Sequence, residues 1–408
     1  MADTDTALEF DEFDAMGQFT DTVAGDVRDP YPDFWALRRD TPVEKDEVTG
    51  MTGEPEEAYV VYRYDDVATV LRDNERFSSA AVRDLMAPVM GPYVLVGMDE
   101  PEHRRHRHLV SQAFRQKSLA HWESDYVEGS MHELIDRFAG RGRAEMVREF
   151  TFRFPVQIIA KVLGIPPEDC PTFHEWAVRI VNCAADPERG LAASASMRDY
   201  LATIVEERRA DPGDDVISDL VTAELDGDVL DDEEIFSFLR LLLPAGAETT
   251  YRATGNFLFG LLSNPDQLEA LRGDRSLMEQ AVEESIRWES PLLITSRTCV
   301  EDTDVGGVTI EAGYHVVPHI GSANHDDSRW DDPDAFDIFR ERKPMIAFGM
   351  GPHMCLGMHL ARMEMATAVG AVLDRLPDIH LDPDADDPHI HGATFRSPTE
   401  LPVVFTPN

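Results

Sequence analysis

Basic residues are scarce in this sequence of 408 residues. Lysine and arginine together number 37 against 78 aspartate and glutamate residues, which gives a formal net charge of −41. The lysines are only Lys45, Lys117, Lys161 and Lys343. Binding to nucleic acid or to an anionic membrane surface needs clustered cations, so we expect neither as a partner. The acidity favours solubility, either as an adaptation to high salt or as plain composition bias.

Cysteine is rare and long apolar runs are missing. The four cysteines are Cys170, Cys183, Cys299 and Cys355. None of them forms a Cys-x-x-Cys pair, which argues against a disulfide framework and a zinc ribbon. No stretch of about 18 apolar residues occurs, and the longest candidate, 235–247, is interrupted by Arg240 and Pro244. The first residues are acidic and do not resemble a secretion signal. We therefore expect a cytoplasmic protein in a reducing compartment.

The sequence also lacks internal repeats and any linker-like change of composition. Residues 1–25 are acidic and weakly periodic, which predicts a mobile N-terminal tail, and residues 26–408 are expected to form a single domain. Apolar periodicity predicts helices at 65–73, 102–116, 119–139, 156–163, 197–209, 233–263, 277–288 and 356–376. Short β-branched runs predict strands at 58–62, 295–321 and 401–405. The expected fold class is mainly α with a small β region.

One glycine-rich segment places a cysteine at the start of a predicted helix. It reads Phe348-Gly349-Met350-Gly351-Pro352-His353-Met354-Cys355-Leu356-Gly357. Glycines let the backbone turn tightly against a flat partner, and free amides at a helix start favour a thiolate. A thiolate in an apolar setting is a strong, electron-donating metal ligand. For this motif alone, a buried structural cysteine is the alternative, and a phosphate loop is a weaker one because no Gly-Lys-Ser/Thr follows.

Three further motifs place charged or hydroxyl groups in predicted helices. Glu248 and Thr249 lie side by side amid apolar residues, and an acid next to a hydroxyl can relay protons. Glu284 and Arg287 share one helix face at i and i+3. The run 103–108, His-Arg-Arg-His-Arg-His, is densely cationic. Taken singly, an outward polar face, an exposed ion pair and a solvated helix face explain these motifs at least as well.

Together, the motifs resemble those of the cytochrome P450 heme-thiolate monooxygenases, over residues 58 to about 405. Phe-Gly-x-Gly-x-His-x-Cys-x-Gly is similar to the heme-binding signature of that family without a departure. Ala245-Gly246-Ala247-Glu248-Thr249-Thr250 is similar to its oxygen-binding motif. The resemblance implies the triangular-prism cytochrome P450 fold. It also implies heme b (iron protoporphyrin IX) between the long helix and the Cys355 loop.

The resemblance further assigns roles to residues at matching positions. Cys355 would be the axial iron ligand, with Phe348 packed near its sulfur. Thr249 would hydrogen-bond dioxygen, and Glu248 would support proton delivery. The residues expected to contact the heme are His103, Arg107, Ala245, Arg297, Phe348, Gly349, His353, Cys355 and Gly357. A buried structural triad would comprise Glu284, Arg287 and Arg340. The run at 104–106 departs from the family pattern in being more basic than usual.

The activity implied by the resemblance is insertion of one atom of O2 into a lipophilic small organic substrate, by hydroxylation, epoxidation or dealkylation. Because no flavin or ferredoxin segment is attached, electrons would come from a separate ferredoxin and ferredoxin reductase. The substrate pocket would draw on a loop at 83–97 and on the stretch near 170–190. Its expected residues are Leu85, Met86, Val89, Met90, Leu241, Ala245, Leu292, Ile294, Thr394 and Phe395. Most of them are apolar, which indicates the lipophilic substrate. The protein is expected to be a monomer.

Other functions stay open at this point. A heme-thiolate peroxygenase, dehydratase or isomerase is one alternative, against which the Glu248–Thr249 pair argues. A non-enzymatic heme sensor is another, and a zinc protein is a third. For the ferredoxin, a small cationic island near Cys355 is expected from Arg104, Arg105, His108 and Arg362. The alternative is that these side chains only pair with local carboxylates.

Overall fold

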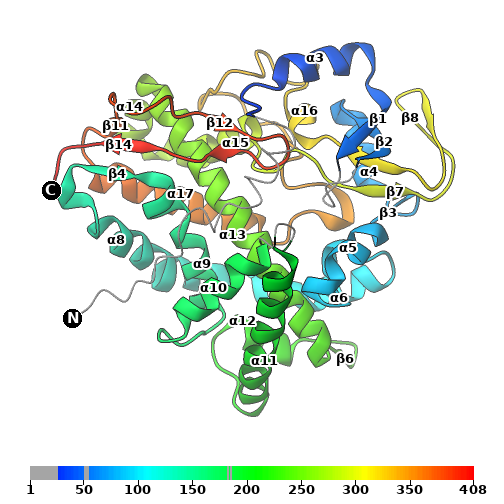
Figure 1. The fold of residues 1–408 in the computed structure, drawn as a ribbon. Coiled ribbons are helices and arrows are strands. Elements are labelled where there is room, and N and C mark those ends of the chain that lie inside the picture. The colour runs from blue at the N-terminus through cyan, green and yellow to red at the C-terminus, as the bar shows by residue number, and fades with distance from the viewer. Residues whose placement is uncertain (1–25, 50–54, 182, 184–185) are drawn as a thin grey trace.

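The computed structural model describes residues 26–49, 55–181, 183 and 186–408. Residues 1–25, for which the sequence predicts a mobile tail, lie outside the described residues. Helices dominate the fold, and the longest described one, α13 (Asp232–Ser263), runs through the middle of the molecule (Figure 1). The structure is mainly helical with a small β region, as the sequence predicts.

Most of the remaining helices lie around α13. Those before it in the chain are α3 (Tyr31–Asp40), α4 (Tyr64–Arg72), α5 (Ala80–Met90), α6 (Glu102–Val110), α7 (Gln116–Trp122), α8 (Glu128–Asp136), α9 (Arg153–Val162), α10 (Cys170–Val181), α11 (Pro187–Ala210) and α12 (Val216–Thr222). Those after it are α14 (Pro265–Gly273), α15 (Met278–Trp288), α16 (Ile320–Asn324) and α17 (Met358–Arg375).

The sequence at the start of α13 explains why the helix begins there. The Asp231 side chain accepts a hydrogen bond from the Glu234 amide, and the Glu234 side chain accepts one from the Asp231 amide. This capping box satisfies two amides that lack a partner within the helix. Along most of its length α13 is buried, and Pro244 removes one backbone donor near its middle. The helix can therefore present different side chains to different parts of the interior.

The main sheet joins strands that are far apart in the chain. Its order is β1 (Val43–Thr49), β2 (Pro55–Val61), β10 (His315–Pro318), β7 (Arg297–Cys299) and β3 (Phe77–Ser78). β2 and β10 pair in parallel, with Ala58 opposite His315, whereas the other neighbours are antiparallel. With α3, α4 and α16, this sheet forms one corner of the molecule (Figure 1).

The other strands of the described residues form four smaller sheets. A three-stranded sheet has the order β11 (His380–Leu381), β14 (Pro402–Val404) and β4 (Arg143–Glu145). The two-stranded pairs are β5 (Glu224–Leu225) with β6 (Asp228–Val229), β8 (Thr303–Val305) with β9 (Val308–Ile310), and β12 (Ile390–His391) with β13 (Ser397–Pro398).

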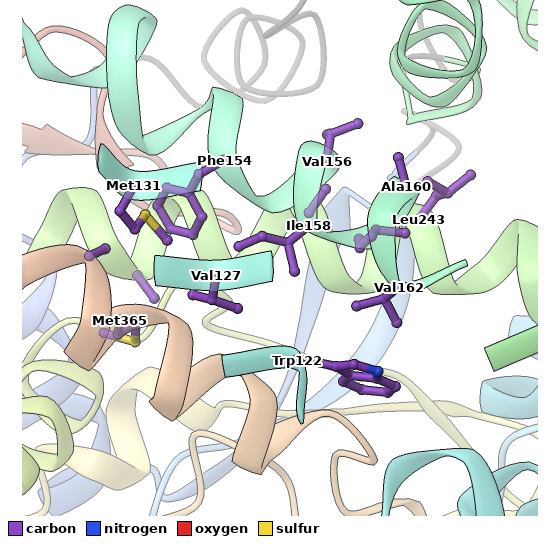
Figure 2. Packing of buried hydrophobic residues seen from close by; sticks show 14 of the residues in the cluster. Trp122, Val127, Met131, Phe154, Val156, Ile158, Ala160, Val162, Leu243 and Met365 are labelled. Carbon is purple, nitrogen blue, oxygen red and sulfur yellow. The ribbon is translucent and has the colours of Figure 1, made fainter. Parts of the chain in front are cut away.

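The largest hydrophobic core lies where α13 packs on α9 and α17, and where α17 packs on α8. Figure 2 shows part of this core, in which Met131, Phe154 and Met365 come from three of these helices. A second, smaller cluster includes Phe77 and Trp330 and lies against the main sheet. The long helix is thus supported along its length by packed apolar side chains.

Several predicted elements have different boundaries in the structure. The predicted helix at 102–116 ends as α6 at Val110, and a 3-10 turn follows before α7. The predicted helix at 197–209 belongs to α11, which begins ten residues earlier because the Asp186 side chain caps it and Pro187 occupies its first turn. The prediction of a loop at 83–97 is wrong for the first half of that range, since residues 80–90 form α5. Pro88 lies inside that helix and weakened the helical signal.

Candidate functional site

The Cys355 segment is a tight loop held by backbone hydrogen bonds. The Cys355 amide donates to the Phe348 carbonyl at 2.8 Å, and the Gly349 amide donates to the Ile346 carbonyl at 2.7 Å. Gly351 has φ of +74°, and a Cβ atom there would lie 2.6 Å from the Leu71 carbonyl oxygen of α4. No other residue type fits that position without moving the backbone. The predicted helix start at 356 shifts slightly, because α17 begins at Met358.

Cys355 is exposed, although protein surrounds most of its side chain. Burial raises the pKa of its thiol, while the Gly357 amide and the guanidinium groups of Arg107 and Arg362 act in the opposite direction. An accessible sulfur within a largely enclosed loop is suited to bind a ligand that approaches from one side. Arg362 also stacks over the Phe348 ring, with 4.3 Å between the guanidinium carbon and the ring centroid.

Four basic side chains from separate segments converge near Cys355. His103 and Arg107 come from α6, Arg297 from β7, and His353 from the turn before Cys355. The His103 and His353 ring centroids are 4.0 Å apart. Burial, followed by the charges of His103, Arg297 and Arg107, lowers the pKa of His353 to about 3. Burial likewise lowers the pKa of Arg297 to about 10. The cluster therefore carries positive charge in a place where water solvates it poorly.

This basic cluster has few acidic or hydrogen-bonding partners. The two ring nitrogens of His103 make no hydrogen bond to any described residue, and Nε of Arg297 makes none either. The Glu100 carboxylate lies 3.5 Å from His103 Nδ1, and the Arg297 Nη1 atom donates to the Ser296 carbonyl. Buried donors without acceptors are costly, so a group with negative charge would stabilise this cluster.

The middle of α13 presents an opening and a hydroxyl. Ala245 is exposed although most of the helix around it is buried. Thr249, one turn later, is half-buried, and its Oγ1 donates to the Ala245 carbonyl at 2.9 Å. Small side chains at this point leave space beside the helix backbone. The Thr249 hydroxyl therefore lies next to the space that Ala245 leaves.

Glu248 is buried and binds an arginine that the sequence interpretation missed. Its Oε1 accepts hydrogen bonds from Arg252 Nη2 at 2.7 Å and Nε at 2.9 Å. Arg252 Nη1 also donates to Ser397 Oγ at 2.9 Å, which ties α13 to β13. The i, i+4 spacing of Glu248 and Arg252 was a visible signal for this pair. Glu248 is therefore held by Arg252 and does not hydrogen-bond Thr249 directly.

Glu284, Arg287 and Arg340, which the family resemblance assigns to a structural triad, lie together in one largely buried cluster. Glu284 accepts from Arg287 at 2.8 Å through each carboxylate oxygen, and from Arg340 Nε at 3.0 Å. Arg287 further donates to the carbonyls of Asn324 and Pro333. The cluster thereby connects α15 to the loop that precedes the Cys355 segment.

Comparison with known proteins decides between the possible families. Residues 186–399, more than half of the chain, match the family model for cytochrome P450. The chain belongs to the cytochrome P450 family. It is 36% identical over 385 residues to cytochrome P450 107B1 of Saccharopolyspora erythraea, covering 90% of this chain and 92% of that protein. It is 35% identical to the cytochrome P450 monooxygenase PikC of Streptomyces venezuelae, covering 87% of this chain and 85% of that protein.

Solved structures agree with this assignment. The crystal structure of CYP109E1 from Bacillus megaterium in complex with testosterone superposes with a TM-score of 0.85 at 32% identity, covering 93% of this chain and 99% of that chain. This P450 is therefore an oxidoreductase that incorporates oxygen from O2, and heme is its family cofactor. In the described part of the chain, no helix has the length and apolar run needed to cross a membrane.

The residues around Cys355 fit a heme. An accessible cysteine sulfur can ligate iron, and the hydrogen-bonding groups left over on His103 and Arg297 suit the two negatively charged heme propionates. Exposed Ala245 on α13 leaves room for a flat group against the helix. Among the described residues, no group of three or more His, Cys, Asp and Glu side chains is arranged to hold a metal ion. The fit therefore rests on one cysteine and a basic rim.

The expected pocket residues come from three parts of the fold. Leu85, Met86, Val89 and Met90 lie on α5, and Leu241 lies on α13. Leu85 is exposed, whereas Met90 and Leu241 are buried. An isolated β-bridge joins Leu292 to Phe395, another joins Ile294 to His319, and the Thr394 carbonyl accepts from the Leu293 amide. The Phe395 ring lies 5.5 Å from the Arg252 guanidinium carbon. Segments from both halves of the chain thus meet beside α13.

The expected cationic island near Cys355 is only partly present. Arg105 binds Asp228 and Glu234, and Arg362 binds Glu283. For these two arginines the structure favours the alternative of local ion pairs. Arg104 is largely exposed, with Glu100 at 3.3 Å, and His108 is exposed.

Proposed function

We propose that this P450 binds heme b through Cys355 and inserts one oxygen atom of O2 into a lipophilic small molecule. The observation that carries the proposal is the accessible Cys355 sulfur next to a buried basic cluster with too few acidic partners. When bound, a cysteinate-ligated heme supplies O2 activation with two electrons and two protons, one oxygen atom leaving as water. His103, Arg107, Arg297 and His353 would hold its propionates.

Thr249 and Glu248 have separate tasks in this proposal. Thr249 holds a proton on Oγ1 beside the space next to Ala245, where O2 would be handled. Glu248 holds its carboxylate on Arg252 and passes protons toward Thr249 through water after a change of side-chain orientation. The Arg252–Glu248 contact supports a gated supply of protons, because the resting carboxylate is bound to the guanidinium and the hydroxyl to the Ala245 carbonyl.

A lipophilic substrate is supported by the apolar side chains on α5 and α13. Relatives point the same way: one is named steroid C26-monooxygenase in Rhodococcus jostii, and CYP109E1 has been crystallised with testosterone and with corticosterone. We further propose that the protein acts as a cytoplasmic monomer with a separate ferredoxin and ferredoxin reductase. Arg104 and His108 are the exposed basic side chains of α6 that remain for docking.

A spectral experiment tests the heme assignment. The reduced protein under carbon monoxide should show the strongly red-shifted Soret band of thiolate ligation. Cys355→Ser should abolish this band, and Cys299→Ala, which changes a buried cysteine in another cluster, should retain it. An unchanged spectrum in Cys355→Ser refutes the assignment. Turnover that runs on peroxide but not on reduced ferredoxin would identify a peroxygenase instead.

A further inference from the structure

One buried arginine on α13 has no acidic partner of its own. The buried arginines of the described residues are Arg38, Arg240, Arg252, Arg287, Arg297 and Arg396. Three of them form ion pairs with Glu248, Glu284 and Glu289. Arg297 belongs to the basic cluster near Cys355, and three aspartates act on Arg38. Arg240 is 6% exposed and forms no ion pair with any described residue.

The contacts of Arg240 leave part of its guanidinium unused. Nε donates to the Phe236 carbonyl at 3.1 Å, and Nη1 donates to Ser194 Oγ at 3.2 Å. Nη2 has no hydrogen-bond acceptor among the described residues. Glu233 is the one carboxylate whose charge acts on Arg240, but Arg198 already binds it. The direct hydrogen bonds of Arg240 therefore go only to neutral oxygen atoms.

The backbone opposite Arg240 is shaped to admit the guanidinium. Gly91, directly after α5, has φ of +100°, which side-chain-bearing residues rarely adopt. A Cβ atom at Gly91 would lie 2.4 Å from Arg240 Nη2 and 2.4 Å from Ser237 Oγ. The absence of a side chain at this position thus makes the space that Nη2 occupies. Ser194 and Ser237 add two hydroxyl groups to the same junction of α5, α11 and α13.

This junction adjoins the proposed substrate pocket. Leu241 follows Arg240 in the chain, and the Val89 carbonyl of α5 accepts a hydrogen bond from Ser194, the residue that also binds Arg240. Arg240 precedes Thr249 by nine residues on α13. At a rise of 1.5 Å and a turn of 100° per residue, the two Cα atoms are about 13.5 Å apart along the axis and on opposite sides of α13, so the guanidinium is placed by its contacts with α5 and α11.

We propose that Arg240 binds the carboxylate of an elongated, otherwise apolar substrate at the junction of α5, α11 and α13. This inference rests on the proposed function and names the substrate class for the same pocket. A guanidinium matches a carboxylate through two parallel hydrogen bonds, and the unused Nη2 atom supplies one of them. Because the net charge of −41 repels anions at long range, recognition of an acid requires a local, unneutralised cation. Arg240 meets that requirement.

The test uses ligands that anchor on the heme and reach toward Arg240. We choose ω-(imidazol-1-yl)alkanoic acids, from octanoic to tetradecanoic, together with their methyl esters, and titrate the Soret band of the holoenzyme. The imidazole binds iron in every case, so the ratio of ester Kd to acid Kd reports on the carboxylate alone. At the chain length that spans the pocket, the wild-type enzyme should favour the acid by about 10–100-fold, the worth of a charged hydrogen bond.

Arg240→Gln should remove this preference and leave the ester Kd unchanged. Arg38→Gln, which changes another buried arginine without an ion pair, should keep the preference. Arg240→Lys should retain part of it, which keeps the test valid where the glutamine variant fails to fold. Equal affinities for acid and ester across the wild-type series overturn the inference. An equal loss for both ligands in Arg240→Gln also overturns it. A protein that shows no thiolate band under carbon monoxide refutes the proposed function instead.

Discussion

Replacing Glu284 by glutamine should destabilise the whole fold. Glu284 is buried, and its two carboxylate oxygens accept from Arg287, from Arg340 and from the Asp337 amide. Glutamine removes the negative charge and leaves both guanidinium groups buried next to a neutral amide. Loss of one partner from a buried ion pair typically costs about 3–5 kcal/mol.

The expected change in melting temperature follows from the size of the chain. At about 2.1 cal/mol/K per residue, 408 residues give an unfolding entropy of about 0.9 kcal/mol/K. A loss of about 4 kcal/mol therefore lowers Tm by about 4–5 °C. Differential scanning calorimetry of the holoenzyme measures this shift. Arg287→Gln should behave in the same way, because Arg287 binds Glu284 through two hydrogen bonds.

Glu283 offers a matched control on the same helix. Its carboxylate binds Arg362, but both side chains are about a quarter exposed, and such pairs contribute below about 1 kcal/mol. Glu283→Gln should therefore lower Tm by about 1 °C or less. If Glu284→Gln costs no more than Glu283→Gln, the argument that burial makes the first pair indispensable is wrong.

Three other predictions concern the Cys355 loop, acid stability and proton supply. Gly351→Ala should weaken heme retention, because a side chain there strains the loop against the backbone of α4 by about 1–3 kcal/mol. Gly370→Ala should not, because the space around Gly370 is open. The rate of heme transfer to apomyoglobin measures both variants. Burial lowers the pKa of His319 to about 3, so the stability gained from its neutral form is complete above pH 6.5 and is lost as the pH falls toward 3. Between pH 7.5 and 5.5, the free energy of unfolding of His319→Asn should therefore fall by about 1.4 kcal/mol less than that of the wild type. Urea titrations at the two pH values measure this difference, and equal falls contradict the prediction. Glu248→Gln should slow turnover about 100-fold, and Thr249→Ala should divert reducing equivalents to peroxide; a Thr249→Ala enzyme with full coupling of NAD(P)H use to product would falsify that role.

Elements with strong local signals were predictable from the sequence. The helix predicted at 233–263 differs from α13 by one residue, because the Asp231–Glu234 capping box and Asn264 mark its two ends. The Cys355 loop was equally visible, since closely spaced glycines are unusual, and Gly349 and Gly351 adopt positive φ angles that favour glycine. Spaced motifs in a fixed order then indicated the family.

Features that depend on tertiary contacts were not predictable in the same way. Residues 80–90 contain Pro88 and carry mixed apolar and polar side chains, so their helical state in α5 depends on packing against neighbouring elements. The sequence placed Arg105 in a cationic island, with pairing to carboxylates as the alternative, but it could not show that Asp228 and Glu234, more than 120 residues away, would bind it. Arg240 read only as an interruption of an apolar run. Its contacts with Gly91 and Ser194 form only in the folded chain, so the sequence did not show them.

The parallel pairing of β2 with β10 also sets the timing of folding during synthesis. The buried side chains of β2, from Ala58 to Val61, leave the ribosome long before His315 can pair with them. At about 5–20 residues per second, the intervening stretch of about 250 residues takes roughly 10–50 s to make. During that interval an apolar strand has one unpaired edge, which is the usual starting point for aggregation. The nascent chain should therefore depend on chaperones, and slower growth at low temperature should raise the yield of soluble enzyme.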